Sequence, residues 1–353
     1  MDAVPISGLP ELQAHLHALV GDAALPIQAQ LLDQVELQLT ETNIPPLLTT
    51  LLPPLTQILK ATSQDPTPLL SLTVKLLTPL SFAQTLAIAD APSLLTALRS
   101  PLPGANLLAL AVVHKAAAAP ADAAILSTLP EVVEELVRRW LESPDVGVGE
   151  RAAKVLGDVL ETDCDVVGSN GVSSVAGNEL VKRSVPGHAR LWRLILQTRP
   201  HLSLIQSSCT PNHHPSRSTH AVTISQGRVL RLLPRLAALN IRVLSQSAFP
   251  DLFPLPDATA QRVGRGLLQW AALGMVTKSD VLMHLSLIDF FEAFVSVMRV
   301  ADHSTERHDL VKSLVRTAVR DDPDLHTALR SLPDRTVEEE AEALRRYVAD
   351  VLG

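Results

Sequence analysis

Apolar and polar residues follow helical spacing along most of the chain, and residues 143–164 are the clearest case. Charged residues occupy one side of the helical projection, and the other side is apolar. The apolar positions are Val148, Ala152, Val155, Leu156, Val159 and Leu160. Pro144 and Asp145 precede them, where a fixed φ and a capping carboxylate favour the start of a helix. The pattern predicts one amphipathic helix.

Gly157 interrupts this helix from inside, at a cost of about 1 kcal/mol relative to alanine. We therefore expect close contact with a neighbouring helix at that residue. A short Pro-Asp turn that leads into a two-sided helix is typical of one layer of an armadillo or HEAT stack.

The same periodicity predicts helices along the rest of the chain. In the first half they are 9–20, 26–39, 44–60, 68–77, 82–89, 93–99, 106–119 and 121–141. In the second half they are 188–197, 228–239, 241–247, 257–273, 279–299, 308–320, 324–332 and 337–352. Pro53 predicts a break within 44–60, because proline removes a helical hydrogen bond. Ser279 is the expected cap of 279–299, a helix too apolar to be fully solvated, which is either deeply buried or part of an interaction surface.

Two segments rich in polar residues lack this periodicity, 165–187 and 203–226. Both are predicted to be loops inserted in a repeat array. The expected organisation is N-terminal helical repeats over 1–164, a flexible insert over 165–187 and C-terminal repeats over 188–353. The second insert lies within the C-terminal repeats, and the whole forms one continuous solenoid.

Composition favours an elongated repeat array over two or three compact domains. Hydrophobic residues make up 46% of the chain but aromatic residues only 3%, so the core must consist of many small aliphatic contacts. The 26 prolines fall mainly between leucine-rich segments, where they end helices. The sequence therefore predicts an all-α fold, an α-solenoid of stacked HEAT/armadillo-like helical repeats.

Charge and cysteine content indicate the setting in which the chain works. The formal net charge is −7 and basic runs are short, which argues against nucleic acid as the main partner. Two cysteines suit a reducing compartment. The N-terminus lacks the pattern of a signal peptide, and charges interrupt the most apolar tract, 107–129, so we expect no membrane span. The expected location is the cytoplasm, the nucleus or both.

Residues with catalytic or metal-binding chemistry occur, but their spacing matches no known site. Cys209, His213, His214 and His220 fit no zinc pattern, and we interpret them as part of a solvated loop. His303 and His308, with Asp302, Glu306 and Asp309, are interpreted as polar residues at a helix start. Gly264-Arg265-Gly266 lacks the preceding strand of a nucleotide-binding loop. We therefore predict no catalytic, cofactor-binding or metal-binding residue.

A stack of paired helices would expose polar residues on a concave wall, where a partner protein could bind. Helix phase alone selects the candidate partner-binding residues for that wall. They are Glu150, Arg151, Lys154, Asp158, Arg190, Arg193, Arg228 and Arg231.

Three segments resemble a known family. They are SPDVGVGERAAKVLGDVLETDC at 143–164, ARLWRLIL at 189–196 and GLLQWAALGMVTKSDVLMHLSLIDFFEAFVSVM at 266–298. The chain resembles the HEAT/armadillo-type assembly chaperones of the 26S proteasome, which include non-ATPase regulatory subunit five and its fungal relatives.

The resemblance implies a function without enzymatic activity. Such a chaperone binds the C-terminal small domain of one AAA ATPase subunit of the proteasome base, delays docking on the 20S core and leaves when the particle matures. We expect the unbound chain to be a monomer. One alternative is a general HEAT/armadillo scaffold or transport adaptor. Another is an all-helical metal-dependent hydrolase that uses Cys209, His213 and His214.

Overall fold

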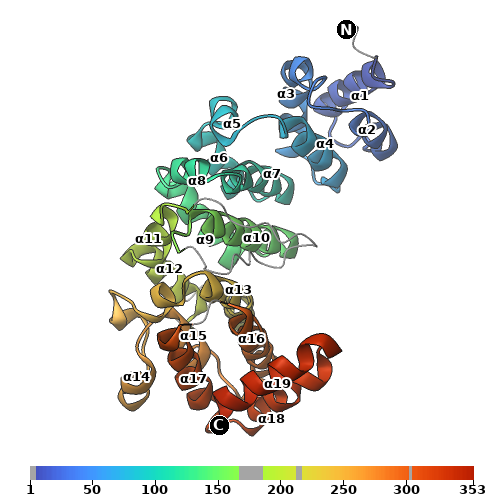
Figure 1. Ribbon diagram of the computed structural model, residues 1–353. Coiled ribbons are helices and arrows are strands. Elements are labelled where there is room, and N and C mark those ends of the chain that lie inside the picture. Colours follow the sequence, from blue (N-terminus) through green and yellow to red (C-terminus); the bar gives the residue numbers. More distant parts are fainter. Residues whose placement is uncertain (1–4, 167–185, 212–216, 302–303) are drawn as a thin grey trace. The chain divides into compact units, whose positions relative to one another are not determined.

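The structure is a computed structural model that describes residues 5–166, 186–211, 217–301 and 304–353. Within these ranges every regular element is a helix (Figure 1). The described residues form nineteen α-helices and four short 3₁₀ helices, with no strand among them. The prediction of an all-α fold is confirmed.

The helices follow one another with short connections. The first ten are α1 (Leu9–Gly21), α2 (Ala29–Glu36), α3 (Leu48–Leu59), α4 (Thr67–Leu77), α5 (Phe82–Ile88), α6 (Ala91–Arg99), α7 (Pro103–His114), α8 (Pro120–Leu126), α9 (Pro130–Glu142) and α10 (Val146–Asp163). The others are α11 (Arg190–Leu196), α12 (Arg199–Cys209), α13 (Thr219–Ser245), α14 (Asp257–Val263), α15 (Leu267–Leu273), α16 (Val281–Val300), α17 (Thr305–Val319), α18 (Pro323–Ser331) and α19 (Glu338–Leu352).

The chain divides into two compact units, and the boundary runs through α9 and α10. The first unit comprises Met1–Arg139 and Asp145–Val155, and the second comprises Trp140–Pro144 and Leu156–Gly353. In the first unit α1 packs on α3, α2 on α4, and α6 on α7; in the second, α13 packs on α15 and α16, and α17 on α19. Within each unit, helices therefore pack mainly on helices that are near them in the sequence.

Helix α10 has the structure that its sequence predicts. The carboxylate of Asp145 accepts a hydrogen bond from the backbone N–H of Val148 at 2.8 Å, and the six predicted apolar positions are buried. A Cβ at Gly157 would lie 2.3 Å from Nη1 of Arg235 and 3.3 Å from Cδ1 of Leu232, both on α13. The predicted close contact at Gly157 is therefore confirmed, and the neighbouring helix is α13.

Asp163, the last residue of α10, fixes the start of α11. Its Oδ2 accepts the backbone N–H groups of Leu191 at 2.6 Å and Trp192 at 3.3 Å. The indole N–H of Trp192 donates to the carbonyl of Leu160 at 2.7 Å. Burial raises the pKa of the Asp163 carboxyl, and the backbone N–H donors offset only part of that rise. Asp163 thus caps α11 from α10.

The predicted break at Pro53 is wrong, because Pro53 and Pro54 lie inside the continuous helix α3. Proline at these positions leaves the carbonyls of Thr49 and Thr50 without helical N–H donors. Both threonines are exposed, so water can supply the missing hydrogen bonds.

Two predicted helices are each divided in the structure. Residues 121–141 form α8 and α9, and Pro130 begins the second, where proline is favoured at the first helical position. Residues 257–273 form α14 and α15, because Gly264 ends α14 with φ +87°. That conformation is accessible mainly to glycine. The break expected between 228–239 and 241–247 appears as a kink in α13 at Asn240.

The loop predicted over 203–226 is wrong for most of its length. Residues 203–209 belong to α12 and residues 219–226 to α13, while 212–216 lie outside the described residues. The serines that suggested a loop have specific partners, since Ser208 donates to Glu142 and Ser225 to the carbonyl of Leu141, each at 2.8 Å. Of the insert over 165–187, only residues 165, 166, 186 and 187 are described.

Asp280 caps α16, and the prediction of Ser279 as the cap is wrong. The Asp280 carboxylate accepts the backbone N–H groups of Leu282 at 3.0 Å and Met283 at 3.2 Å. The middle of helix α16 is buried, whereas residues near its start are exposed. Phe290, Phe291, Phe294 and other residues of its middle are buried, whereas Val281, Leu282 and Leu285 near its start are each more than half exposed.

Among the described residues, α16 is the one helix with the length and hydropathy of a membrane span, and 39% of its most apolar window is buried. Helices α4 and α5 would pass the same test as a pair bent by 116°. Buried core helices meet these criteria too, and α16 packs along α13 and also contacts α18 and α19.

Gln269 on α15 is an unusual residue of the core. It is fully buried, and neither its amide nitrogen nor its amide oxygen has a hydrogen-bond partner. A buried amide without partners costs about 1–3 kcal/mol. We therefore expect Gln269→Met, which keeps the shape of the side chain, to raise the free energy of unfolding by about 1 kcal/mol. Urea denaturation measures this, and an unchanged or lower stability would indicate that an ordered water binds the amide.

Candidate functional site

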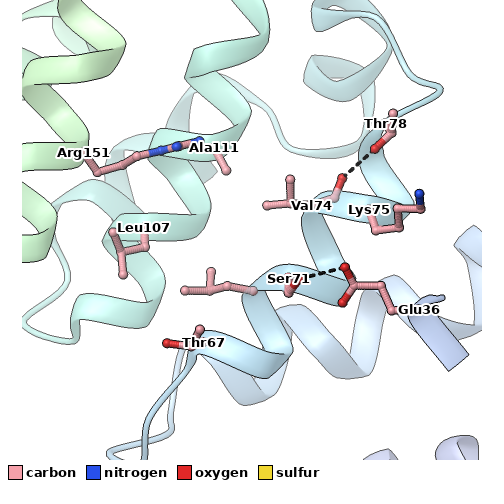
Figure 2. A pocket seen from close by; sticks show the side chains of 10 residues that line it. Glu36, Thr67, Ser71, Val74, Lys75, Thr78, Leu107, Ala111 and Arg151 are labelled. Carbon is pink, nitrogen blue, oxygen red and sulfur yellow. Dashed lines mark hydrogen bonds between the residues drawn. The ribbon is translucent and has the colours of Figure 1, made fainter. Parts of the chain in front are cut away.

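A groove on the first unit combines an apolar floor with charged residues (Figure 2). Its volume is about 500 Å³. Helix α2 contributes Glu36, α7 contributes Leu107 and Ala111, and α10 contributes Arg151. The remaining lining residues come from α4 and its C-terminal cap: Thr67, Leu70, Ser71, Val74, Lys75 and Thr78. The groove is therefore built mainly on α4 and α7.

The sequence of α4 explains its two faces. The residues that pack into the unit are buried: Leu69, Leu72, Thr73, Leu76 and Leu77. Thr73 satisfies its hydroxyl by donating to the carbonyl of Leu69 at 2.7 Å. The groove face carries smaller or polar side chains, and Val74 on it is 41% exposed.

Helix α7 is apolar on almost every side and lies close to α3 and α4. A Cβ at Gly104 would lie 3.1 Å from Cβ of Pro66 and 3.2 Å from the carbonyl oxygen of Leu59. This close approach holds the first turn of α7 against the connection that precedes α4. Leu107 and Ala111, which are partly exposed, then line the groove opposite α4.

The charged side chains of the groove have few partners of opposite charge. The Glu36 carboxylate accepts the Ser71 hydroxyl at 2.8 Å. The partner of Arg151 is a histidine, since its Nη2 lies 3.4 Å from Nδ1 of His114. Among the described residues, no carboxylate pairs with Lys75 or Arg151. Arg151 lies on the α7 side of the groove, whereas Lys75 and Glu36 lie together on the side of α4 that is away from Arg151 (Figure 2).

The first unit contains three of the predicted partner-binding residues, all on α10. Arg151 lines the groove, while Glu150 and Lys154 are exposed on the same helix. The groove residues Glu36, Val74 and Lys75 were missed by the sequence reasoning. The exposed positions Thr67, Ser71, Val74 and Thr78 follow a four-three-four spacing, which is a signal that could have found this face.

The second unit contains the other five, and they differ in exposure. Arg190, Arg193 and Arg231 are exposed. Asp158 is partly buried in an ion pair with Nη2 of Arg235 at 2.7 Å. The same nitrogen lies 2.6 Å from Glu161. Asp158 thus has a structural role between α10 and α13.

The prediction that Arg228 faces outward is wrong. Arg228 is only 6% exposed, and its Nη1 donates to the carbonyls of Ser143 at 2.8 Å and Leu141 at 3.2 Å. The last carbonyls of a helix lack helical N–H donors. Arg228 supplies donors at the end of α9, which accounts for a buried arginine on a helix face that the sequence assigns to solvent.

The residues with metal-binding chemistry do not assemble in the described part of the chain. Cys209 is fully buried, and burial raises the pKa of its thiol. His213 and His214 lie outside the described residues, and His220 is exposed. Within the described ranges, no group of three or more His, Cys, Asp or Glu residues could hold a metal ion.

A second cavity, of about 530 Å³, lies between α16, α17 and α19 of the second unit. Nε2 of His308 lies 2.6 Å from Asp350, Arg299 pairs with Glu340, and burial raises the pKa of Tyr347 to about 12. Its main charges are thus mutually paired, in contrast to those of the first groove.

The first groove is suited to binding through shape and charge. Its floor offers contact to apolar side chains, and its cations offer charge-assisted hydrogen bonds to carboxylates. Comparison with models of known protein families and with curated protein sequences finds no match for this chain.

Proposed function

We propose that the chain is a non-enzymatic chaperone for assembly of the base of the 26S proteasome regulatory particle. The resemblance of 143–164, 189–196 and 266–298 to that family motivates the proposal. The observation that carries it is the all-helical architecture, in which helices of each unit pack mainly on their neighbours in the sequence. Such local packing is the property of an α-solenoid of HEAT/armadillo-like repeats, the fold we propose here.

The proposed partner is the C-terminal domain of one AAA ATPase subunit of the base ring, bound on a concave surface in the cytoplasm or the nucleus. Support comes from the polar face of α10, where Glu150 and Lys154 are exposed and Arg151 lines an open groove. Charges that remain solvated at a partner surface promote association and select the partner.

A direct binding experiment tests this function. The purified chain is passed over the immobilised C-terminal domain of each base-ring ATPase in turn. We expect saturable, one-to-one binding to one of these domains. Failure to bind any of them would overturn the proposal.

A general scaffold or transport adaptor is the alternative that the same architecture allows. Pull-down from cells, followed by identification of the co-purifying chains, separates the two functions. Proteasome ATPase subunits among those chains support the chaperone, and transport components in their place support the adaptor. The metal-dependent hydrolase is tested by elemental analysis, because it requires stoichiometric zinc in the purified protein.

Reversing two charges on α10 should weaken binding of the ATPase domain. We expect Arg151→Glu combined with Lys154→Glu to raise its Kd about tenfold, which corresponds to about 1.4 kcal/mol. Neither side chain is buried, so the far-ultraviolet circular dichroism should not change. Normal affinity with unchanged helicity would show that α10 lies outside the binding surface.

A further inference from the structure

The exposed face of α4 forms one continuous side of the groove. Thr67, Ser71, Val74 and Thr78 are all exposed and all line it. Positions at this spacing share one face of a helix. From the first to the last, the face extends about 16 Å, or three helical turns. The groove is therefore elongated along α4.

The opposite side is shorter and apolar. Leu107 and Ala111 are one turn apart on α7, and Figure 2 shows Arg151 approaching from α10 beside Ala111. Small-molecule sites usually bury most of their ligand, whereas the α4 side of this groove is open to solvent. A groove between two helices with an apolar floor suits an amphipathic helix, whose apolar face it can cover.

The charged residues of the groove favour a ligand that carries negative charge. Lys75 has no ion-pair partner among the described residues, and Arg151 contacts a histidine ring but no carboxylate. Glu36 is engaged by the Ser71 hydroxyl. The groove thus carries two cations that lack carboxylate partners in the described part of the chain, and one carboxylate that keeps its charge.

We propose that this groove binds an amphipathic helix of a partner protein, with apolar side chains on one face and carboxylates beside them. Its leucine-like side chains contact Val74, Leu107 and Ala111. Its carboxylates pair with Lys75 and Arg151. The inference rests on one part of the proposed function, that the ligand of the chain is a protein, and is independent of which protein that is.

Fluorescence anisotropy with two labelled peptides tests the inference on the full chain. Both peptides carry leucines at positions i, i+3, i+4 and i+7, flanked by glutamates in one peptide and by lysines in the other. We expect the glutamate peptide to bind at least tenfold more tightly than the lysine peptide. Lys75→Glu should weaken binding of the glutamate peptide about tenfold and should strengthen binding of the lysine peptide.

Lys60→Glu is the matched control, because Lys60 is an exposed lysine of the same unit outside the groove. It makes the same change in net charge and should leave both affinities within about twofold. Equal binding of the two peptides, no binding of either, or equal effects of Lys75→Glu and Lys60→Glu would overturn the inference.

Binding of the ATPase domain separates this inference from the proposed function. If the domain binds wild type and Lys75→Glu equally, the groove is not its site, although the chaperone function stands. If no ATPase domain binds but the peptides behave as expected, the groove inference stands and the proteasome function fails.

Discussion

Replacing Gly266 with alanine should lower the free energy of unfolding of the second unit by about 3 kcal/mol. A Cβ at this residue would lie 2.4 Å from the carbonyl oxygen of Leu244 and 2.5 Å from the carbonyl carbon of Ser245. Both atoms belong to the backbone of α13, so they cannot move aside by a change of rotamer. Forcing an atom into a packed core usually costs 1–3 kcal/mol, and contact with backbone places this substitution at the upper end, at about 3 kcal/mol.

Urea denaturation followed by tryptophan fluorescence measures this effect. The three tryptophans, Trp140, Trp192 and Trp270, all belong to the second unit, so their emission reports its unfolding.

Gly227→Ala is the matched control, since a Cβ at Gly227 would meet no atom within 4 Å. Gly227 lies inside α13, where alanine is favoured over glycine by about 1 kcal/mol. The same chemical change should therefore destabilise the unit at Gly266 and stabilise it at Gly227. Effects of the same sign at both residues would contradict the packing of α15 on α13.

The sequence is most informative where a helix can be understood from its own residues. In α10 the buried apolar positions and the Asp145 cap are local properties, and the structure confirms both. The close contact at Gly157 was also predicted from local reasoning. A glycine inside a helix lowers stability, so its presence indicates a neighbour that leaves no room for a larger side chain. The identity of that neighbour, α13, required the fold.

The failures occur where tertiary partners decide the outcome. Arg228 was predicted to face solvent, but it donates to carbonyls at the end of α9, far away in the sequence. Ser208 and Ser225 suggested a loop, yet each has a hydrogen-bond partner far away in the sequence that periodicity cannot reveal. Intrinsic propensity is a weak guide where such contacts exist.

The groove illustrates both situations. Arg151 was found from helix phase, because it lies on the polar side of α10. Lys75 and Val74 were not, because the candidate residues were chosen only from α10, α11 and α13. The spacing of Thr67, Ser71, Val74 and Thr78 marks the exposed face of α4, but the arrangement of α4 beside α7 is needed to show that this face lines a groove.

Asp322→Ala should also lower the stability of the second unit by about 3 kcal/mol. The side chain of Asp322 is 2% exposed. It accepts hydrogen bonds from Lys278 at 2.7 Å, His284 at 2.9 Å and the backbone N–H of Leu325 at 3.0 Å. Removing one partner of a buried ion pair costs about 3–5 kcal/mol, because the other charge is left without compensation. Lys278 is 40% exposed and can reach water, which favours the lower end of that range.

Asp350→Ala is the matched control, because Asp350 also binds one lysine and one histidine. Lys312 lies at 2.7 Å and His308 at 2.6 Å, but the Asp350 side chain is 50% exposed. Exposed ion pairs contribute about 0–1 kcal/mol, so this substitution should cost at most about 1 kcal/mol. Equal costs for the two variants would show that burial does not determine the contribution of Asp322.

The pH dependence gives an independent test of the same site. Burial alone would raise the pKa of Asp322, but hydrogen bonds from Lys278, the Leu325 N–H and His284 hold this pKa below its ordinary value. The unfolded chain therefore binds the proton more readily, and the stabilisation is present above the ordinary aspartate pKa of about 3.9. We expect the stabilisation that Asp322 provides through its own charge to be fully present above about pH 4. It should shrink as the pH falls below about 4, because protonation removes the charge that holds Lys278.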